Sequence, residues 1–200
     1  MNFLAHIYLS GNNKLLTIGN FAADGIRGKI FTKYPKAMQA GIVLHRYIDT
    51  YTDAHPIFRQ STKRLHKPYG HYSGVIVDIF YDHFLAKNWS EYSNKPLNEY
   101  IQGFYVSLNE NFEVLPPRFK KLTPFMIEDN WLLSYATVEG IQKVLNGMNN
   151  RTKGLSKMNN ATKELIENYE AFENDFKLFF EDLRAYAEIK RIELTKEYNL

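Results

Sequence analysis

Apolar residues recur at spacings of three and four along most of the chain, and runs of strict alternation are rare. This period is typical of amphipathic α-helices rather than of β-strands. Clusters of Gly, Pro and Asn separate the periodic stretches and mark candidate helix ends. The pattern predicts helices at about 14–27, 35–53, 57–65, 73–87, 97–111, 116–127, 131–135, 138–148 and 161–196.

The 200 residues contain no internal repeat, no low-complexity segment and no linker long enough to separate domains. We therefore expect residues 1–200 to form a single all-α domain, a compact multi-helix bundle. Residues 161–200 should contribute a long amphipathic helix that packs on this bundle, because Leu165, Phe172 and Phe176 fall on one stripe.

The chain has no cysteine, which excludes disulfides, cysteine-ligated zinc, iron–sulfur clusters and a cysteine nucleophile. Its apolar start is short and lacks a basic residue, so it does not resemble a secretory signal, and no stretch is long enough to span a membrane. We expect a soluble, cytoplasmic protein. The net charge of +3 is too small to indicate nucleic-acid binding but is compatible with an acidic partner.

Two of the predicted helices carry His and Asp side chains on apolar surfaces. His45 and Asp49 are four residues apart, so they share one face of the second predicted helix. Asp78 and Asp82 have the same spacing on the fourth predicted helix, which is apolar nearly all round, as buried helices are. Because burying an unpaired carboxylate is costly and two close carboxylates repel, a positive charge must compensate the second pair.

The compensating group is an arginine, a protonated histidine or a metal ion. Histidine and aspartate in the absence of cysteine form a ligand set that suits Mn²⁺, Fe²⁺, Mg²⁺ or Zn²⁺ in hydrolytic enzymes. The alternative is structural: His45 and Asp49 would form a surface pair, and Arg27 and Arg46 would each neutralise a carboxylate. Composition and spacing leave both interpretations open.

Four segments that contain these positions stand out: NFLAH at 2–6, GNFAADGIRG at 19–28, GIVLHRYIDTYTD at 41–53 and DIFYDHFLAKNW at 78–89. In these segments the sequence resembles a known family, the acyl carrier protein phosphodiesterases, also called holo-acyl-carrier-protein hydrolases. Weaker matches follow near residues 116–119, 131–132 and 144–148, so the resemblance covers about the first three quarters of the chain.

The family is described as a divergent, all-helical relative of the HD-domain metal phosphohydrolases, so the resemblance implies an HD-domain-like fold. It also implies a divalent cation, with Mn²⁺ as the first choice and Mg²⁺ or Fe²⁺ as alternatives. The usual adjacent His-Asp dyad is missing, and we assign ligands from the burial argument instead. The expected metal ligands are Asp24, His45, Asp49, Asp78 and Asp82.

The expected catalytic residues are His6, His83, Arg27 and Arg46. Either arginine would offset the charge that develops on the phosphoryl oxygens. A histidine would give a proton to the departing serine oxygen. His6 is also the next candidate for a metal ligand, and His83 would either bind the metal or orient a ligand.

The activity that the resemblance implies is removal of 4′-phosphopantetheine from the serine of holo-acyl carrier protein, a step in lipid metabolism that accompanies fatty acid biosynthesis. Acyl carrier proteins are acidic, so a basic docking patch is expected at Arg118, Lys120 and Lys121, or at Arg27 and Lys29. Two other hypotheses are a phosphohydrolase of the same fold acting on a small nucleotide or another phosphoester, and a non-catalytic helical binding module. The oligomeric state is open.

Overall fold

The computed structural model describes all 200 residues. Its regular elements are all helices, with no strand, as the periodicity predicted. None of these helices combines the length and the apolar character needed to cross a membrane. The α-helices are α1 (Phe3–Leu9), α2 (Lys14–Ala22), α3 (Lys36–Ala54), α4 (Pro56–Tyr69), α5 (Ser73–Lys87), α6 (Trp89–Tyr92), α7 (Leu97–Glu110), α8 (Pro117–Glu128), α9 (Trp131–Ser134), α10 (Val138–Arg151), α11 (Ala161–Glu167) and α12 (Tyr169–Tyr198).

The helices differ from the predicted ones in several places, and the short helix α6 is among those that the periodicity did not predict. Residues 3–9 form α1, which the periodicity did not predict, and the first predicted helix ends early, at Ala22, where the short 3-10 turn η1 (Ala23–Gly25) follows. Helix α4 continues through Pro68 to Tyr69 instead of ending near residue 65. The carboxy-terminal segment is divided at Asn168 into α11 and α12.

Helices α2 and α3 approach each other closely because both have glycine at the contact. A Cβ atom added to Gly19 would lie 2.2 Å from the Met38 carbonyl oxygen, and one added to Gly41 would lie 2.0 Å from the Leu16 carbonyl oxygen. No side chain fits at such distances, so only glycine permits this packing. The close contact brings the backbone of α2 within hydrogen-bonding distance of side chains on α3.

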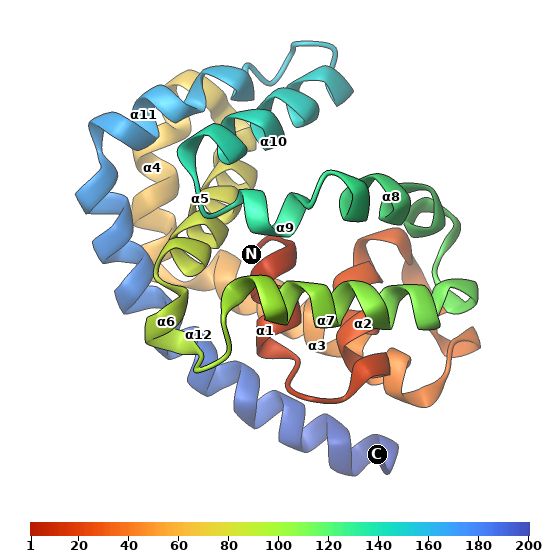
Figure 1. Cartoon of the computed structure of the whole chain (residues 1–200). Helices are drawn as coiled ribbons and strands as arrows, with labels where there is room; N and C mark the ends of the chain where they lie inside the picture. Colours follow the sequence, from red (N-terminus) through yellow and green to blue (C-terminus); the bar gives the residue numbers. More distant parts are fainter.

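The long helix α12 runs along one side of the molecule and packs against α3, α4, α5 and α1 (Figure 1). Its apolar stripe, including Phe172, Phe176 and Leu183, is fully buried. The buried hydrophobic residues form one continuous core from Met1 to Leu194. The start of the chain lies in the middle of the molecule, near α1, α5 and α9 (Figure 1).

Candidate functional site

Two histidines and an aspartate from α1 and α3 meet near the start of the chain. The rings of His6 and His45 stack with their centroids 4.1 Å apart. Their Nε2 atoms lie 3.3 Å and 3.0 Å from the two carboxylate oxygens of Asp49. The three candidate ligand atoms all lie within 4.8 Å of one another, close enough for one metal ion to contact all three.

A fourth residue, Asp24 of η1, borders this group, with its Oδ1 3.3 Å from His45 Nε2. We call His6, His45, Asp49 and Asp24 the His–Asp cluster. Asp24, His45 and Asp49 are three of the predicted metal ligands and His6 is one of the predicted catalytic residues, and the structure brings these four together. They come from three separate elements, α1, η1 and α3.

Asn20 of α2 sets the tautomer of both imidazoles. Its backbone carbonyl accepts the Nδ1–H of His45 at 2.9 Å, and its side-chain oxygen accepts the Nδ1–H of His6 at 2.8 Å. The amide can adopt only this orientation, since its nitrogen donates to the His6 carbonyl and to Ser10 Oγ, both at 2.9 Å. With both Nδ1 atoms protonated, the Nε2 lone pairs of neutral His6 and His45 are directed at Asp49.

The residues of the cluster fit a divalent cation, because His6 Nε2 faces only acceptors and the carboxylates of Asp24 and Asp49 converge on the two imidazoles. His6 Nε2 lies 3.1 Å from the Met1 carbonyl oxygen as well as near Asp49, and neither oxygen carries a proton. A buried nitrogen that faces only acceptors needs a cation or a shared proton. Two imidazoles with carboxylates are ligands that suit Mn²⁺, Fe²⁺ or Zn²⁺.

Electrostatics within the cluster place the only available proton on His45. Burial lowers the pKa of His45, but its hydrogen bonds to Asp24 and Asp49 outweigh burial and raise the pKa to about 9. Burial and then the neighbouring charge on His45 lower the pKa of His6 to about 4. Burial opposes ionisation of Asp49, yet the bonds to both histidines hold its pKa well below the usual range. Without a cation, His45 is thus the protonated member of the cluster, and its Nε2–H lies between the carboxylates of Asp24 and Asp49; a bound cation would take the place of this proton.

Asp82, predicted as a metal ligand, is directed to α1 instead. It is fully buried, and its two carboxylate oxygens accept the backbone N–H groups of Leu4 and Ala5 at 2.7 Å and 3.1 Å. These amides belong to the first turn of α1, where a helix has no internal acceptors for them and favours negative charge. Asp82 therefore positions the helix that carries His6, and the structure does not bring its carboxylate into the His–Asp cluster.

Asp78, the other predicted ligand on α5, forms an ion pair with the amino group of Met1 at 2.8 Å. Burial raises the pKa of Asp78, and the amino group acts against this rise. The positive charge that the sequence required for the pair on α5 thus comes from the amino-terminal segment. The spacing of four correctly placed Asp78 and Asp82 on one face, but α1 and Met1 pack against that face, and the His–Asp cluster does not include either carboxylate.

The other three predicted catalytic residues lie outside the cluster. His83 donates from Nδ1 to the Tyr135 carbonyl and accepts the Tyr169 hydroxyl at Nε2, both at 2.7 Å, so a neutral imidazole there is fully satisfied. Arg46 donates to the Gly28 carbonyl at 3.0 Å and lies over the ring of Phe31. Arg27 is exposed at the start of the next 3-10 turn, η2 (Gly28–Lys33).

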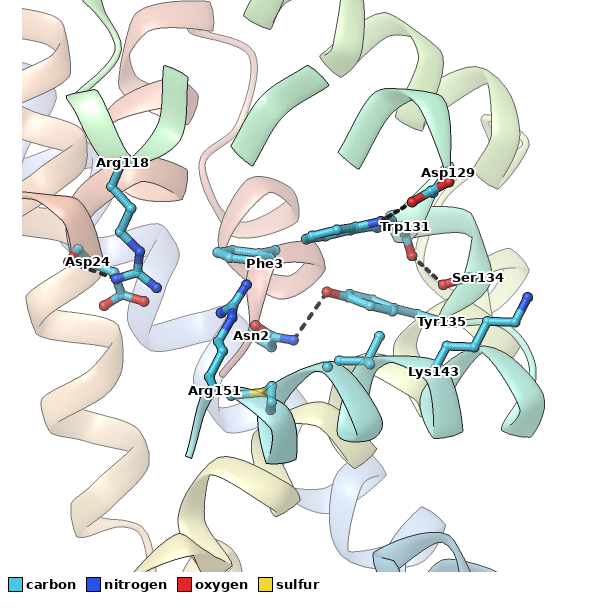
Figure 2. Close-up of a pocket in the computed structure, with 13 residues that line it drawn as sticks. Asn2, Phe3, Asp24, Arg118, Asp129, Trp131, Ser134, Tyr135, Lys143 and Arg151 are labelled. Carbon is cyan, nitrogen blue, oxygen red and sulfur yellow. Dashed lines mark hydrogen bonds between the residues drawn. The ribbon is translucent and has the colours of Figure 1, made fainter. Parts of the chain in front are cut away.

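A pocket of about 500 Å³ opens beside the cluster, and Asp24 belongs to both. Figure 2 shows Arg118 beside Asp24, Arg151 below Phe3 and next to Asn2, and Lys143 at the opposite end, beyond Tyr135. The apolar lining consists mainly of aromatic and aliphatic side chains from α1, α9 and α10, namely Phe3, Trp131, Tyr135, Val144 and Met148.

This pocket is not among the features predicted from the sequence, although the spacing of residues on α10 carries one sign of it. Lys143, Gly147 and Arg151 follow one another at intervals of four and so share a face of α10, and that face lines the pocket. A basic–glycine–basic stripe on a helix is also compatible with a solvated surface. Only the packing of α8 and α9 opposite this face turns it into a pocket wall.

Comparison with known proteins gives a consistent result. The family model described as acyl carrier protein phosphodiesterase matches residues 1–183. An acyl carrier protein phosphodiesterase of Yersinia pestis is 31% identical over 193 residues, which cover 96% of this chain and all of the relative. One from Salmonella agona is 32% identical over the same shares.

No solved structure matches the chain significantly, so the likeness to HD-domain folds stays a prediction. The resemblance that the motifs indicated is confirmed by a match across nearly the whole chain, including the carboxy-terminal part that the motifs did not cover. The chain belongs to the acyl carrier protein phosphodiesterase family.

Proposed function

We propose that this chain hydrolyses the phosphodiester that joins 4′-phosphopantetheine to the serine of holo-acyl carrier protein, with a divalent cation held by the His–Asp cluster. The observation that carries the proposal is the position of Asp24. Its carboxylate contacts His45 in the cluster, and the same residue lines the pocket that contains Arg118 and Arg151. A phosphodiester at this junction would lie beside the cation ligands and within reach of two guanidinium groups.

The cluster's own residues would hold the cation through His6 Nε2, His45 Nε2 and the carboxylates of Asp49 and Asp24. When bound, a divalent cation supplies a nucleophile near neutral pH and positive charge for the phosphoryl oxygens. Mn²⁺ is our first choice, with Mg²⁺ and Fe²⁺ as alternatives. Asn20 keeps both Nε2 lone pairs available by accepting the protons on the two Nδ1 atoms.

The arginines at the pocket would bind the phosphate oxygens of the substrate. Arg118 lies next to Asp24, and its Nη1 is 3.4 Å from the Asp24 carbonyl oxygen. Neither Arg118 nor Arg151 forms an ion pair with a carboxylate of the chain, so the guanidinium groups of both are available to an anion. Guanidinium groups bind phosphate through paired N–H donors. These residues take the role that the sequence analysis gave to Arg27 and Arg46.

The protein substrate is expected to approach over α8. Arg118 and Lys121, together with Arg151 and the exposed Phe125, line a shallow groove next to the pocket. Lys120 is engaged with Glu113 at 2.7 Å and is less available. A basic groove with an exposed aromatic ring suits an acidic carrier protein, because complementary charge guides the encounter and the ring provides apolar contact.

The proposal is tested by incubating the purified protein and Mn²⁺ with holo-acyl carrier protein and recording intact masses. The expected result is loss of the phosphopantetheine mass from the carrier protein, and the loss should cease when a chelator is added. His45→Ala should abolish it. The matched control is His55→Ala. His55 contacts Asp182 at 3.3 Å, away from the His–Asp cluster, so this variant should keep its activity. An unchanged carrier-protein mass with metal bound to the enzyme would refute the proposal.

A further inference from the structure

The pocket beside the His–Asp cluster has a layout suited to one class of ligand. We infer that it binds the 4′-phosphopantetheine arm itself, with the phosphate at the end formed by Arg118, Arg151 and Asp24 and the chain extending along Phe3 and Trp131. This inference rests on the proposed function for the identity of the arm. It adds the place, the orientation and the residues that would recognise the arm.

The charge in the pocket is uneven along its length. Arg118 and Arg151 lie toward Asp24, whereas the opposite end carries a single lysine, Lys143 (Figure 2). Asp24 and Asp129 are the two acidic residues of the pocket lining. Asp129 accepts the indole N–H of Trp131 at 3.3 Å. When the Asp24 carboxylate faces a cation, no carboxylate competes with an anionic ligand for the guanidinium groups of Arg118 and Arg151. The strongest site for an anion is therefore next to the cluster.

The middle of the pocket is apolar but contains one donor and one acceptor suited to an amide. The hydroxyl of Tyr135 accepts a hydrogen bond from the Asn2 side-chain nitrogen at 3.2 Å. This leaves the hydroxyl proton of Tyr135 and the side-chain oxygen of Asn2 without a partner in the protein. The pantetheine chain contains two amides and a dimethyl group, so it offers a carbonyl and an N–H to this pair and apolar surface to the aromatic rings.

Gly147 lets the ligand approach the wall formed by α10. A Cβ atom added at Gly147 would meet nothing within 4 Å, so a side chain there would project into open space along the pocket. A larger residue can therefore fill part of the pocket without disturbing the fold. Gly103 of α7 is a matched control: it is also an exposed glycine inside a helix, and its only neighbour within 4 Å is the end of the flexible Lys95 side chain.

The test is a titration of the protein, in the presence of saturating Mn²⁺ so that Asp24 faces a cation, with free 4′-phosphopantetheine, with pantetheine and with inorganic phosphate, monitored by calorimetry and tryptophan fluorescence. Phosphopantetheine should bind best and should change the emission of Trp131. Gly147→Leu should weaken its binding by about tenfold or more, because the added side chain occupies ligand space. Gly103→Leu should bind like the original protein.

Arg151→Met provides a second variant, since it removes the charge but keeps much of the stem. It should weaken the binding of phosphopantetheine by about tenfold and leave the binding of pantetheine nearly unchanged, as expected for the loss of one charged group that hydrogen-bonds to the phosphate. Absence of phosphopantetheine binding to the original protein, or equal binding by Gly147→Leu and Gly103→Leu, would overturn the pocket assignment. If holo-acyl carrier protein is nevertheless hydrolysed in that case, the proposed function stands and only the pocket assignment fails.

Discussion

The side-chain oxygen of Asn20 accepts the Nδ1–H of His6 at 2.8 Å. Through this contact Asn20 of α2, which is not itself a proposed ligand, determines which ring nitrogen of His6 is available to a cation. The backbone carbonyl of Asn20 does the same for His45. One fully buried residue thus prepares two ligands on two other helices.

Asn20→Ala should lower the affinity for Mn²⁺ by about 10–100-fold, because removing the hydrogen-bond partner of a metal-bound histidine usually weakens metal binding by about this factor. The physical reason is that His6 loses the acceptor that keeps its proton on Nδ1. Isothermal titration calorimetry with MnCl₂ measures the change directly.

The control for this variant is Asn13→Ala on the same helix. Asn13 caps α2 by accepting the Leu16 N–H at 3.1 Å, so its loss should cost about 0.5–2 kcal/mol of stability. Its affinity for Mn²⁺ should be unchanged. Equal affinities in the two variants would show that Asn20 does not orient the ligands.

Asp82→Ala should destabilise the protein without removing the metal site. The substitution leaves the buried N–H groups of Leu4 and Ala5 without acceptors, and we expect a loss of about 1–3 kcal/mol in the free energy of unfolding. Urea denaturation followed by circular dichroism measures this loss. At a temperature where the variant is folded, it should still bind one equivalent of Mn²⁺. Loss of the metal at unchanged stability would instead identify Asp82 as a ligand.

His83 should make the protein less stable in acid. Burial lowers the pKa of His83 from its usual 6.5, so the unfolded chain takes up a proton at this residue before the folded protein does. Stability due to His83 is therefore complete above about pH 6.5 and falls as the pH decreases toward the lowered pKa, by at most about 1.4 kcal/mol per pH unit.

His83→Gln should lose this contribution, so its stability should decrease less steeply than that of the original protein between pH 7.5 and about pH 5. Urea denaturation at several pH values gives the two slopes. The comparison variant is His66→Gln, at an exposed histidine of α4, which should keep the original slope. An identical pH dependence in all three proteins would contradict a neutral, structural His83.

Gly41→Ala should separate α2 from α3 and disturb the cluster. The new Cβ atom would lie 2.0 Å from the Leu16 carbonyl oxygen, so the helices must move apart, at a cost of about 1–3 kcal/mol or more. Because Asn20 and His45 lie on these two helices, Mn²⁺ affinity should fall as well. Gly103→Ala, in open space on α7, should instead raise stability by up to about 1 kcal/mol. Thermal denaturation with and without Mn²⁺ distinguishes the two variants.

The sequence by itself determined the all-helical class and the main helices, because the spacing of apolar residues reports which face of each helix is buried. It also placed His45 and Asp49 on one face of α3, since a separation of four is a local property of a helix. The motifs at 2–6, 19–28, 41–53 and 78–89 indicated the family, which the comparison confirmed.

Only the tertiary structure decided which charge each buried carboxylate meets. Asp78 and Asp82 share a face and need positive partners, yet their partners are Met1 and the first turn of α1, more than 70 residues away in the chain. The choice of imidazole nitrogen by Asn20 and the pocket between α1, α8, α9 and α10 are likewise contacts between distant segments. Periodicity describes neighbours along one helix, whereas these contacts depend on how separate helices pack, and that arrangement is set by the whole core.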